Sequence, residues 1–265
     1  MARSQAVHSG GRPEAFPGRV GLLPMNSPDT GTRPLAEELL LLCADPADGR
    51  LRIPALTLST AVAGAVLAEL QLAGTITVDG RRITGHRLPG DQDELAAAVL
   101  ADLGQAGEGR PRTLEHALRA LTHPHGRATH HHLDRMVGQG VLTVRSHRFL
   151  GLPYRRWTAV RPDAGALIAA RTAATLARAG LSGLSGFSGP TGLSGPTGAA
   201  DPTDPADERD RQLAGLIGAA GLERRLYRGP NGAETRHAVR QLARDLPVPR
   251  AVKREITRRR SQSGG

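Results

Sequence analysis

The sequence predicts a mainly α-helical, compact domain with two β-hairpins, a disordered N-terminal arm and a flexible linker rich in Ser, Gly and Pro. Aromatic residues make up only 2% of the 265 residues, so the core must consist of Leu, Ala, Val and Ile. Such a core favours helix-on-helix packing over a β-sandwich. Apolar residues also recur at helical spacing in several segments, and two of these segments lead into hairpin-like runs.

The first 34 residues are rich in Gly, Pro, Ser and Arg and have no apolar period, which predicts a disordered arm. The helical core is expected over residues 35–180. Its first helix begins at Leu35, carries two acidic residues in its first turn as the helix dipole prefers, and ends near Asp45.

A second helix is expected to start at Ser59 or Thr60, because both are N-cap residue types, and to run to Ala73. Gly74 is well placed to end it. The alternating run that follows reverses at an Asp-Gly pair, which predicts a hairpin over residues 75–83.

Further along, the pattern predicts helices at 92–103, 113–121 and 128–137 and a second hairpin at 141–152. Arg145, Ser146 and His147 are expected near the turn of that hairpin. The two helix–hairpin units resemble each other and constitute a weak internal repeat.

An Ala-rich helix is predicted at 164–179, followed by a flexible low-complexity linker over 181–206. Helices within 207–246 are expected to pack on the core. Pro247 and Pro249 are expected to end them, leaving a basic tail at 247–265.

The positive charge is concentrated near one end of the sequence. Residues 209–265 carry fourteen basic and five acidic side chains, a net of +9 out of +10 for the whole chain. Such a block attracts anionic surfaces, either membrane or nucleic acid.

The sequence also predicts the compartment. Cys43 is the only cysteine, so no disulfide can form within the chain, which fits a reducing compartment. The first residues lack the apolar core of a signal peptide, and the apolar run at 53–68 is too short to span a bilayer. We therefore expect a soluble, cytoplasmic protein.

Five stretches resemble the Golgi phosphoprotein 3 family in the expected order. They are LAEELLLL at 35–42, AVLAELQLAGTI at 65–76, LPGDQDELAAAV at 88–99, LDRMVGQGVLTV at 133–144 and DRQLAGLIGAAGLE at 210–223. The resemblance implies a divergent member of this family of peripheral adaptors. It also implies a helical fold with hairpins and binding of phosphatidylinositol 4-phosphate on the cytoplasmic face of a membrane.

The family's lipid pocket resembles a shallow basic site built from a Trp and several Arg. Carried onto this sequence, its positions fall at Pro54 and Ala63 and near Gly126 and Thr129, so none of these side chains is retained. Arg52 and Arg127 lie close by in the sequence and are candidates to replace them.

The second hairpin supplies the other candidates for headgroup binding. Arg155, Arg156 and Trp157 follow it, and Arg145 and Arg148 lie within it. Arg can grip phosphate, and Trp prefers the membrane interface. Alternatively, Trp157 belongs to the core and the Arg side chains are merely solvated.

The resemblance also associates this hairpin with self-assembly, for which its apolar residues are the candidates, namely Phe149, Leu150 and Leu152. The other interpretation is that they cover the domain core. Anionic headgroups, a second copy of the chain and client membrane proteins are the expected partners.

We expect no enzyme and no cofactor. The sequence has no P-loop, no GxSxG and no HExxH. Five histidines fall within residues 123–132, but three of them are consecutive and would point in different directions on a helix, so no metal site is predicted.

A winged-helix nucleic-acid-binding protein is the alternative function, because a helix, a Gly and a hairpin with Arg occur twice. Against it, the candidate recognition helix at 60–73 has no basic residue, and the one at 128–137 has few.

Overall fold

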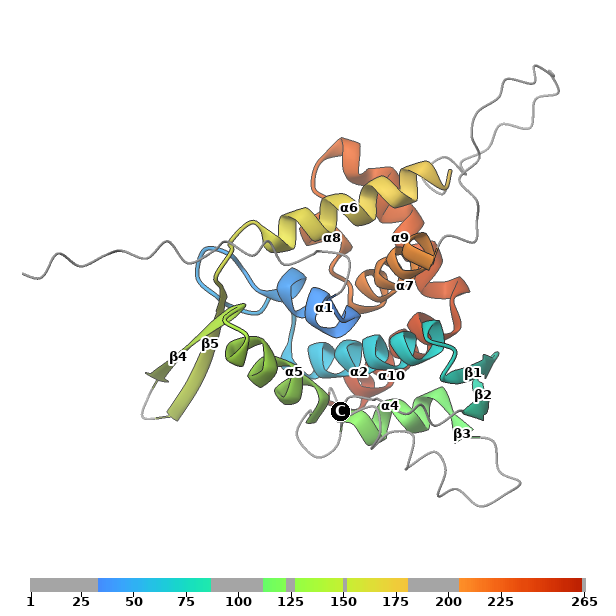
Figure 1. The fold of residues 1–265 in the computed structure, drawn as a ribbon, viewed down its shortest axis with the longest axis horizontal. Coiled ribbons are helices and arrows are strands. Elements are labelled where there is room, and N and C mark those ends of the chain that lie inside the picture. Colours follow the sequence, from blue (N-terminus) through green and yellow to red (C-terminus); the bar gives the residue numbers. More distant parts are fainter. Residues whose placement is uncertain (1–32, 87–111, 123–126, 150–151, 181–204, 264–265) are drawn as a thin grey trace, which may run out of the picture. The chain divides into compact units, whose positions relative to one another are not determined.

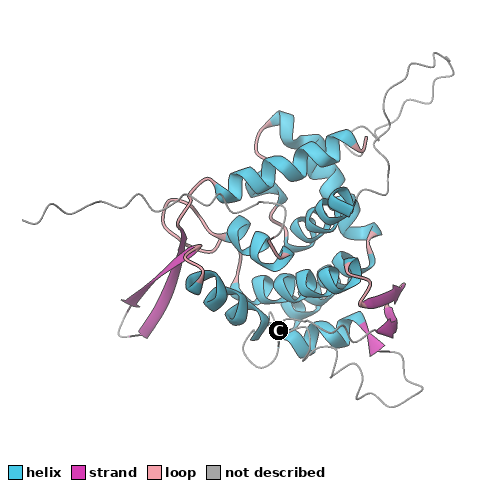
Figure 2. Cartoon of the chain, in the orientation of Figure 1, coloured by secondary structure: helices cyan, strands magenta, loops and turns pink. Residues whose placement is uncertain are grey.

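In the computed structural model, residues 33–86, 112–122, 127–149, 152–180 and 205–263 are described, and all belong to one compact unit. They form a helical bundle with two small antiparallel sheets at its edges (Figures 1 and 2), which confirms the predicted fold class. The predicted arm up to residue 32, the helix at 92–103 and nearly all of the linker lie outside the described residues.

Helix α2 (Ala55–Leu72) is the central element of the bundle, and 67% of it is buried. Its neighbours are α1 (Leu35–Cys43), α4 (Leu114–Thr122), α5 (Arg127–Gly138), α7 (Pro205–Ala220) and α10 (Pro247–Ser263). A recognition helix must be exposed to enter a DNA groove. The buried α2 therefore cannot serve as one, which weakens the winged-helix alternative.

The start of α2 corrects the sequence prediction. Pro54 occupies the N-cap position, and the hydroxyls of Ser59 and Thr60 donate to the carbonyl of Leu56 from within the helix, at 3.1 and 2.9 Å. Pro is well tolerated at a helix start because its missing N–H would have no partner there.

This earlier start gives α2 eighteen residues, long and apolar enough by those two criteria to cross a membrane. The expectation that no segment reaches that length was wrong. A buried core helix passes the same test, and α2 is surrounded by other helices.

Four shorter or peripheral segments complete the helical part of the described residues. They are α6 (Ala164–Arg178), α8 (Glu223–Leu226), a 3-10 turn at Pro230–Gly232 and α9 (Ala233–Asp245).

The first sheet contains the predicted hairpin and one strand more. β1 (Ile76–Asp79) pairs with β2 (Arg82–His86), and β3 (Arg112–Thr113) adds to the far edge of β2. The turn between β1 and β2 places Gly80 at φ 58°, in the left-handed region that an Asp-Gly hairpin turn requires.

The second sheet is a longer hairpin of β4 (Leu142–Phe149) and β5 (Leu152–Ala159). Arg145, Ser146 and His147 pair with Arg156, Arg155 and Tyr154 in mid-strand. The expectation that they lie near the turn was wrong, because the alternating pattern continues through Phe149.

The expected basic tail is helix α10. Its buried residues are Val248, Pro249, Ala251, Val252, Glu255 and Ile256. Their spacing follows one helical face, and the Arg and Lys residues between them lie outside it. Pro247 begins the helix rather than preventing it, because prolines fit the first turn of a helix.

Glycines let the central helices approach each other closely. A Cβ on Gly64 of α2 would lie 2.2 Å from Cγ2 of Val252, and one on Gly215 of α7 would lie 2.7 Å from Cγ of Pro249. These two contacts seat α10 against α2 and α7. At these two points close approach of the helices leaves no gap that a large side chain would have to fill.

Helix α1 is buried at every position, including two adjacent glutamates that are each 1% exposed. Glu37 accepts from Nε of Arg135 on α5 at 2.7 Å. Glu38 accepts from both terminal nitrogens of Arg171 on α6, at 3.2 and 2.7 Å. Nε of Arg171 also donates to Asp210 on α7 at 3.0 Å, so one guanidinium joins three helices.

Burial is the largest influence on Glu38 and raises the pKa of its carboxyl, while the hydrogen bonds and charge of Arg171 lower it in part. The folded protein therefore holds a proton on Glu38 more tightly than the unfolded chain does. The contribution of this group to stability is greatest below its ordinary pKa and declines as the pH rises through its folded pKa.

Replacing Arg171 with Met should lower the free energy of unfolding by about 3 kcal/mol at neutral pH, because two buried carboxylates lose their shared cation. The deficit should shrink between about pH 8 and pH 5, since the carboxyl of Glu38, whose pKa burial already raises, then takes up a proton more readily. Urea denaturation at the two pH values measures this. Glu38→Gln keeps Arg171 and Asp210 paired and is the control. A deficit that is independent of pH would contradict the account.

Replacing Gly64 with Ala should cost about 1–3 kcal/mol, because Val252 cannot move away without displacing α10. Gly138 of α5 is the matched control. Nothing lies within 4 Å of a Cβ placed there, and its backbone needs no positive φ. Gly138→Ala should be neutral or stabilising by up to about 1 kcal/mol. Equal midpoints of thermal unfolding for the two variants would refute the close contact.

Candidate functional site

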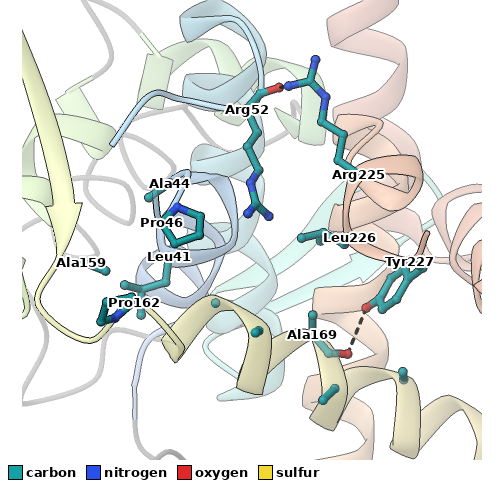
Figure 3. A pocket seen from close by; sticks show the side chains of 14 residues that line it. Leu41, Ala44, Pro46, Arg52, Ala159, Pro162, Ala169, Arg225, Leu226 and Tyr227 are labelled. Atoms are coloured by element: carbon teal, nitrogen blue, oxygen red, sulfur yellow. Dashed lines mark hydrogen bonds between the residues drawn. The ribbon is translucent and has the colours of Figure 1, made fainter. Parts of the chain in front are cut away.

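A pocket of about 370 Å³ lies between α1, α6 and α8 (Figure 3). Its walls are mostly small apolar side chains, and Arg52, Arg225 and Tyr227 are its only lining residues with ionisable groups. We call it the Arg52 pocket. Its volume is near the lower end of the range for small-molecule sites. The apolar and backbone part of the lining comes from Leu41, Ala44, Pro46, Ala159, Pro162, Gly165, Ala166, Ala169, Ala170, Ala173 and Leu226.

Helix α6 creates the hollow because its pocket-facing side chains are small. Ala166, Ala169, Ala170 and Ala173 follow the spacing of one helical face. Gly165 brings this face close to α1, since a Cβ there would lie 2.8 Å from the carbonyl oxygen of Leu41. Helices α1 and α6 are therefore in close contact at Gly165, and the small alanine side chains further along α6 leave the space of the pocket.

Two arginines lie at the pocket. Figure 3 shows the guanidinium of Arg52 pointing into the space between Leu41 and Leu226. It donates to the carbonyl oxygen of Leu42 at 3.4 Å, and its Nε lies 3.8 Å from Asp45. Both contacts are long, so N–H groups of Arg52 remain available to a ligand. Arg225 donates to the backbone carbonyl of Arg52 and is exposed.

Tyr227 closes the end of the pocket near α8. Its hydroxyl donates to the carbonyl oxygen of Ala169 at 3.4 Å (Figure 3). Burial, helped by the charge of Asp210, raises the pKa of this phenol well above its usual range. Tyr227 is therefore neutral at physiological pH, and the charge at the pocket comes from its two guanidinium groups.

The loop at residues 45–52 connects the pocket to the β4–β5 hairpin. Asp45 and Asp48 each accept a backbone N–H from two residues further along, both at 2.9 Å, which fixes the loop. Gly49 has a φ of 65°, and a Cβ there would lie 2.6 Å from Oγ1 of Thr158 on β5. The loop that carries Arg52 thus rests on the base of the hairpin.

The hairpin projects from the helical body at the left of Figure 1. Its register pairs Arg145 with Arg156 and, one position along, Ser146 with Arg155. Paired residues share a face and neighbours alternate. The two pairs therefore place arginines on both faces of the ribbon. Arg145 and Arg155 are exposed and Arg156 is partly buried.

Trp157 pairs with Val144 on the same face as Arg155, and its side chain is partly buried against the hydrophobic core. The interpretation that assigned it to the core is thus partly right. Arg148 pairs with Pro153 nearer the tip. The structure brings the hairpin candidates together and places Arg52 at the hairpin's base.

The remaining candidates are less defined. Phe149 and Leu152 are the last pair of the ladder, and Leu150 lies outside the described residues. Their role in self-association stays a prediction. Arg127 is the first residue of α5.

The positions of the family's lipid pocket do not form an open basic site in the described residues. Ala63 has no exposed surface and Thr129 is 8% exposed, while Pro54 is exposed at the start of α2. Gly126 lies outside the described residues. The Arg52 pocket is a different place, lined by α6 and α8 rather than by α2 and α5.

Sequence reasoning identified Arg52 but missed Arg225 and the alanine face of α6. It also missed that three of the four exposed large apolar side chains in the described ranges lie on or just after the hairpin. These are Val144 on β4 at 41% exposure, Val160 directly after β5 at 54% and Leu167 in the first turn of α6, the helix that follows, at 47%. The helical period of alanines at 166–173 was the available signal for the pocket.

The described part of the histidine-rich segment lies on α5. His130 is exposed, His131 is partly buried and His132 is 3% exposed. Within the described residues no group of three His, Cys, Asp or Glu side chains is arranged to hold a metal ion.

Cys43 is fully buried, and burial raises the pKa of its thiol to about 12.

The family model of Golgi phosphoprotein 3 (GPP34) matches residues 35–258 of the chain. The protein belongs to this family. No curated protein matches the chain. The match begins at the first residue of α1 and ends within α10, so it covers the helical bundle, the hairpin and the Arg52 pocket. Membership supports an adaptor role, and the family is one of peripheral, membrane-associated proteins.

Proposed function

We propose that this GPP34-family protein is a non-catalytic adaptor on the cytoplasmic face of a membrane. In this proposal it binds anionic phospholipid headgroups, phosphoinositides among them, through the β4–β5 hairpin and the Arg52 pocket. The observation that carries the proposal is the projecting hairpin with exposed arginines on both faces, whose base adjoins a pocket into which the guanidinium of Arg52 points.

The hairpin has the chemistry of a membrane-contacting surface. Each guanidinium near an anionic leaflet contributes about 1 kcal/mol. Exposed Val144 and partly buried Trp157 lie together on one face, and an indole favours the interface between headgroups and lipid tails. Weak contacts of this kind give reversible, salt-sensitive binding rather than insertion.

The Arg52 pocket suits a small anionic headgroup. The guanidinium of Arg52 points into it, and guanidinium groups form paired hydrogen bonds with phosphate oxygens. The guanidinium of Arg225 donates to the backbone carbonyl of Arg52 and so supports the residue that would hold the headgroup. Its lining holds no carboxylate, histidine, thiol or hydroxyl other than the neutral Tyr227. With no general base among these residues, the pocket is suited to hold a ligand rather than to transform it.

Self-association through the hairpin tip, with Phe149, Leu150 and Leu152 as the candidate contacts, would multiply these weak contacts. Linking several binding sites raises the apparent affinity for a surface without new contacts. Client membrane proteins would then be gathered at the same membrane.

The first test compares sedimentation with vesicles that contain or lack phosphatidylserine. Arg145→Ser combined with Arg155→Ser should weaken binding to anionic vesicles by roughly thirtyfold, because two exposed charges worth about 1 kcal/mol each are lost. Arg224→Ser combined with Arg244→Ser removes two exposed arginines elsewhere and is the control. Trp157 is the only tryptophan, so a blue shift of its fluorescence on vesicle binding reports the hairpin directly. The proposed surface would be refuted if both double variants lost vesicle binding equally, or if the protein bound equally to vesicles with and without phosphatidylserine.

The second test fills the pocket. Ala170 is exposed on α6 and lines the pocket, so Ala170→Phe should occupy it with little effect on folding. The variant should still bind phosphatidylserine vesicles through the hairpin, but its affinity for a soluble inositol phosphate should fall roughly tenfold. An unchanged affinity for the inositol phosphate would place the headgroup elsewhere.

A further inference from the structure

Helices α9 and α10 form a second cationic surface. An open groove of about 560 Å³ lies between them, lined by Ala243, Arg244, Arg250, Lys253, Arg254, Thr257 and Arg258. A second hollow of about 420 Å³ shares Arg244 and continues along α9 past His237, Arg240, Gln241 and Asp245. We call the two together the α9–α10 groove. Six of its lining residues are Arg or Lys, and Asp245 is the single acid.

Helical amphipathicity creates this groove. α10 buries one face in the core, so its cations are displayed on the opposite side. α9 does the same with Ala238, Val239, Leu242 and Ala243 as its buried face. The two helices pack against each other, and their polar faces meet along the groove.

Several of these cations have no partner within the described residues. Arg258 pairs with Glu255, and Arg254 lies 3.9 Å from Glu115. Arg244, Arg250 and Lys253 make no side-chain hydrogen bond or ion pair with any described residue. Because like charges repel, gathering them at one place is unfavourable unless an anion binds there.

The spacing of the cations fits one class of anion. Arg250, Arg254 and Arg258 follow each other at four-residue steps, as do Arg240 and Arg244, and each step rises about 6 Å along a helix. In an extended peptide, every second side chain points to the same side, at intervals of about 6.6–6.8 Å. Carboxylates at alternate positions of an extended segment therefore match the rows of guanidinium groups.

The groove is less suited to a membrane or to nucleic acid. None of the exposed large apolar side chains in the described residues lies in it, so it offers nothing to insert into a leaflet. Its lining also contains no Phe, Tyr or Trp on which a base could stack.

We propose that the α9–α10 groove binds an acidic segment of a partner protein in extended conformation. The hairpin lies at the left of the helical body in Figure 1 and α9 at the right. Membrane and partner would thus engage different surfaces. This binding does not require lipid and stands independently of the proposed function.

The test measures fluorescence anisotropy of labelled peptides with the full chain in the absence of lipid. One peptide has Glu at every second position between Ser residues, and the other has the same composition with its Glu residues in one block. We expect tighter binding of the alternating peptide. Arg244→Glu combined with Lys253→Glu should weaken it by roughly tenfold or more. Arg82→Glu combined with Arg224→Glu makes the same change in net charge at two exposed positions outside the groove and should leave the affinity nearly unchanged.

Equal weakening by both double variants would mean nonspecific charge attraction and would overturn the proposal. So would equal binding of the two peptides, or no binding of either at low salt. The groove would be reassigned to nucleic acid if a labelled DNA duplex or single strand bound more tightly than the peptide and if Arg244→Glu combined with Lys253→Glu abolished that DNA binding. Arg244→Ser combined with Lys253→Ser replaces the charge-reversal variant if circular dichroism shows that the latter is not folded.

Discussion

The guanidinium of Arg171 is the contact on which the arrangement of the pocket depends. It binds Glu38 of α1 and Asp210 of α7 from its position on α6, and Asp210 also accepts from the hydroxyl of Thr175 at 2.9 Å. Because α1 is buried at every position, its glutamates need partners within the protein, and neighbouring helices supply Arg135 and Arg171. This requirement fixes α6 beside α1, and the alanine face of α6 then leaves the hollow into which Arg52 points.

Much of the fold could be predicted because the helical period of apolar residues is strong in a chain with few aromatics. The elements whose bounds were predicted wrongly share a cause. Each prediction relied on the preference of single residues, such as caps and prolines, and these residues have more than one role in a helix. Ser59 and Thr60 are good caps, but their hydroxyls can also donate to a carbonyl inside a helix, as they do here. Pro247 and Pro249 look like helix breakers, but at a helix start they are tolerated. Strand β3 has only two residues, too few for a period.

The site was less predictable, because arginines with different environments look alike in a sequence. Arg135 and Arg171 join buried helices through carboxylates, whereas Arg145 and Arg155 are exposed on the hairpin. Arg52 and Arg225 are distant in sequence and meet only through the packing of α8 against the loop at 45–52. Net charge therefore indicated an anionic partner, but only tertiary structure separates the cations that hold the fold from those that remain available to a ligand.

The place of α10 in the core has a consequence for synthesis of the chain. A ribosome makes α10 after α2, α4 and α7, all of which it contacts in the folded state. Until then Gly64 and Gly215 lack their contacts with Val252 and Pro249. During this interval the face of α2 that α10 covers in the folded protein stays open, and transiently exposed apolar surface favours aggregation.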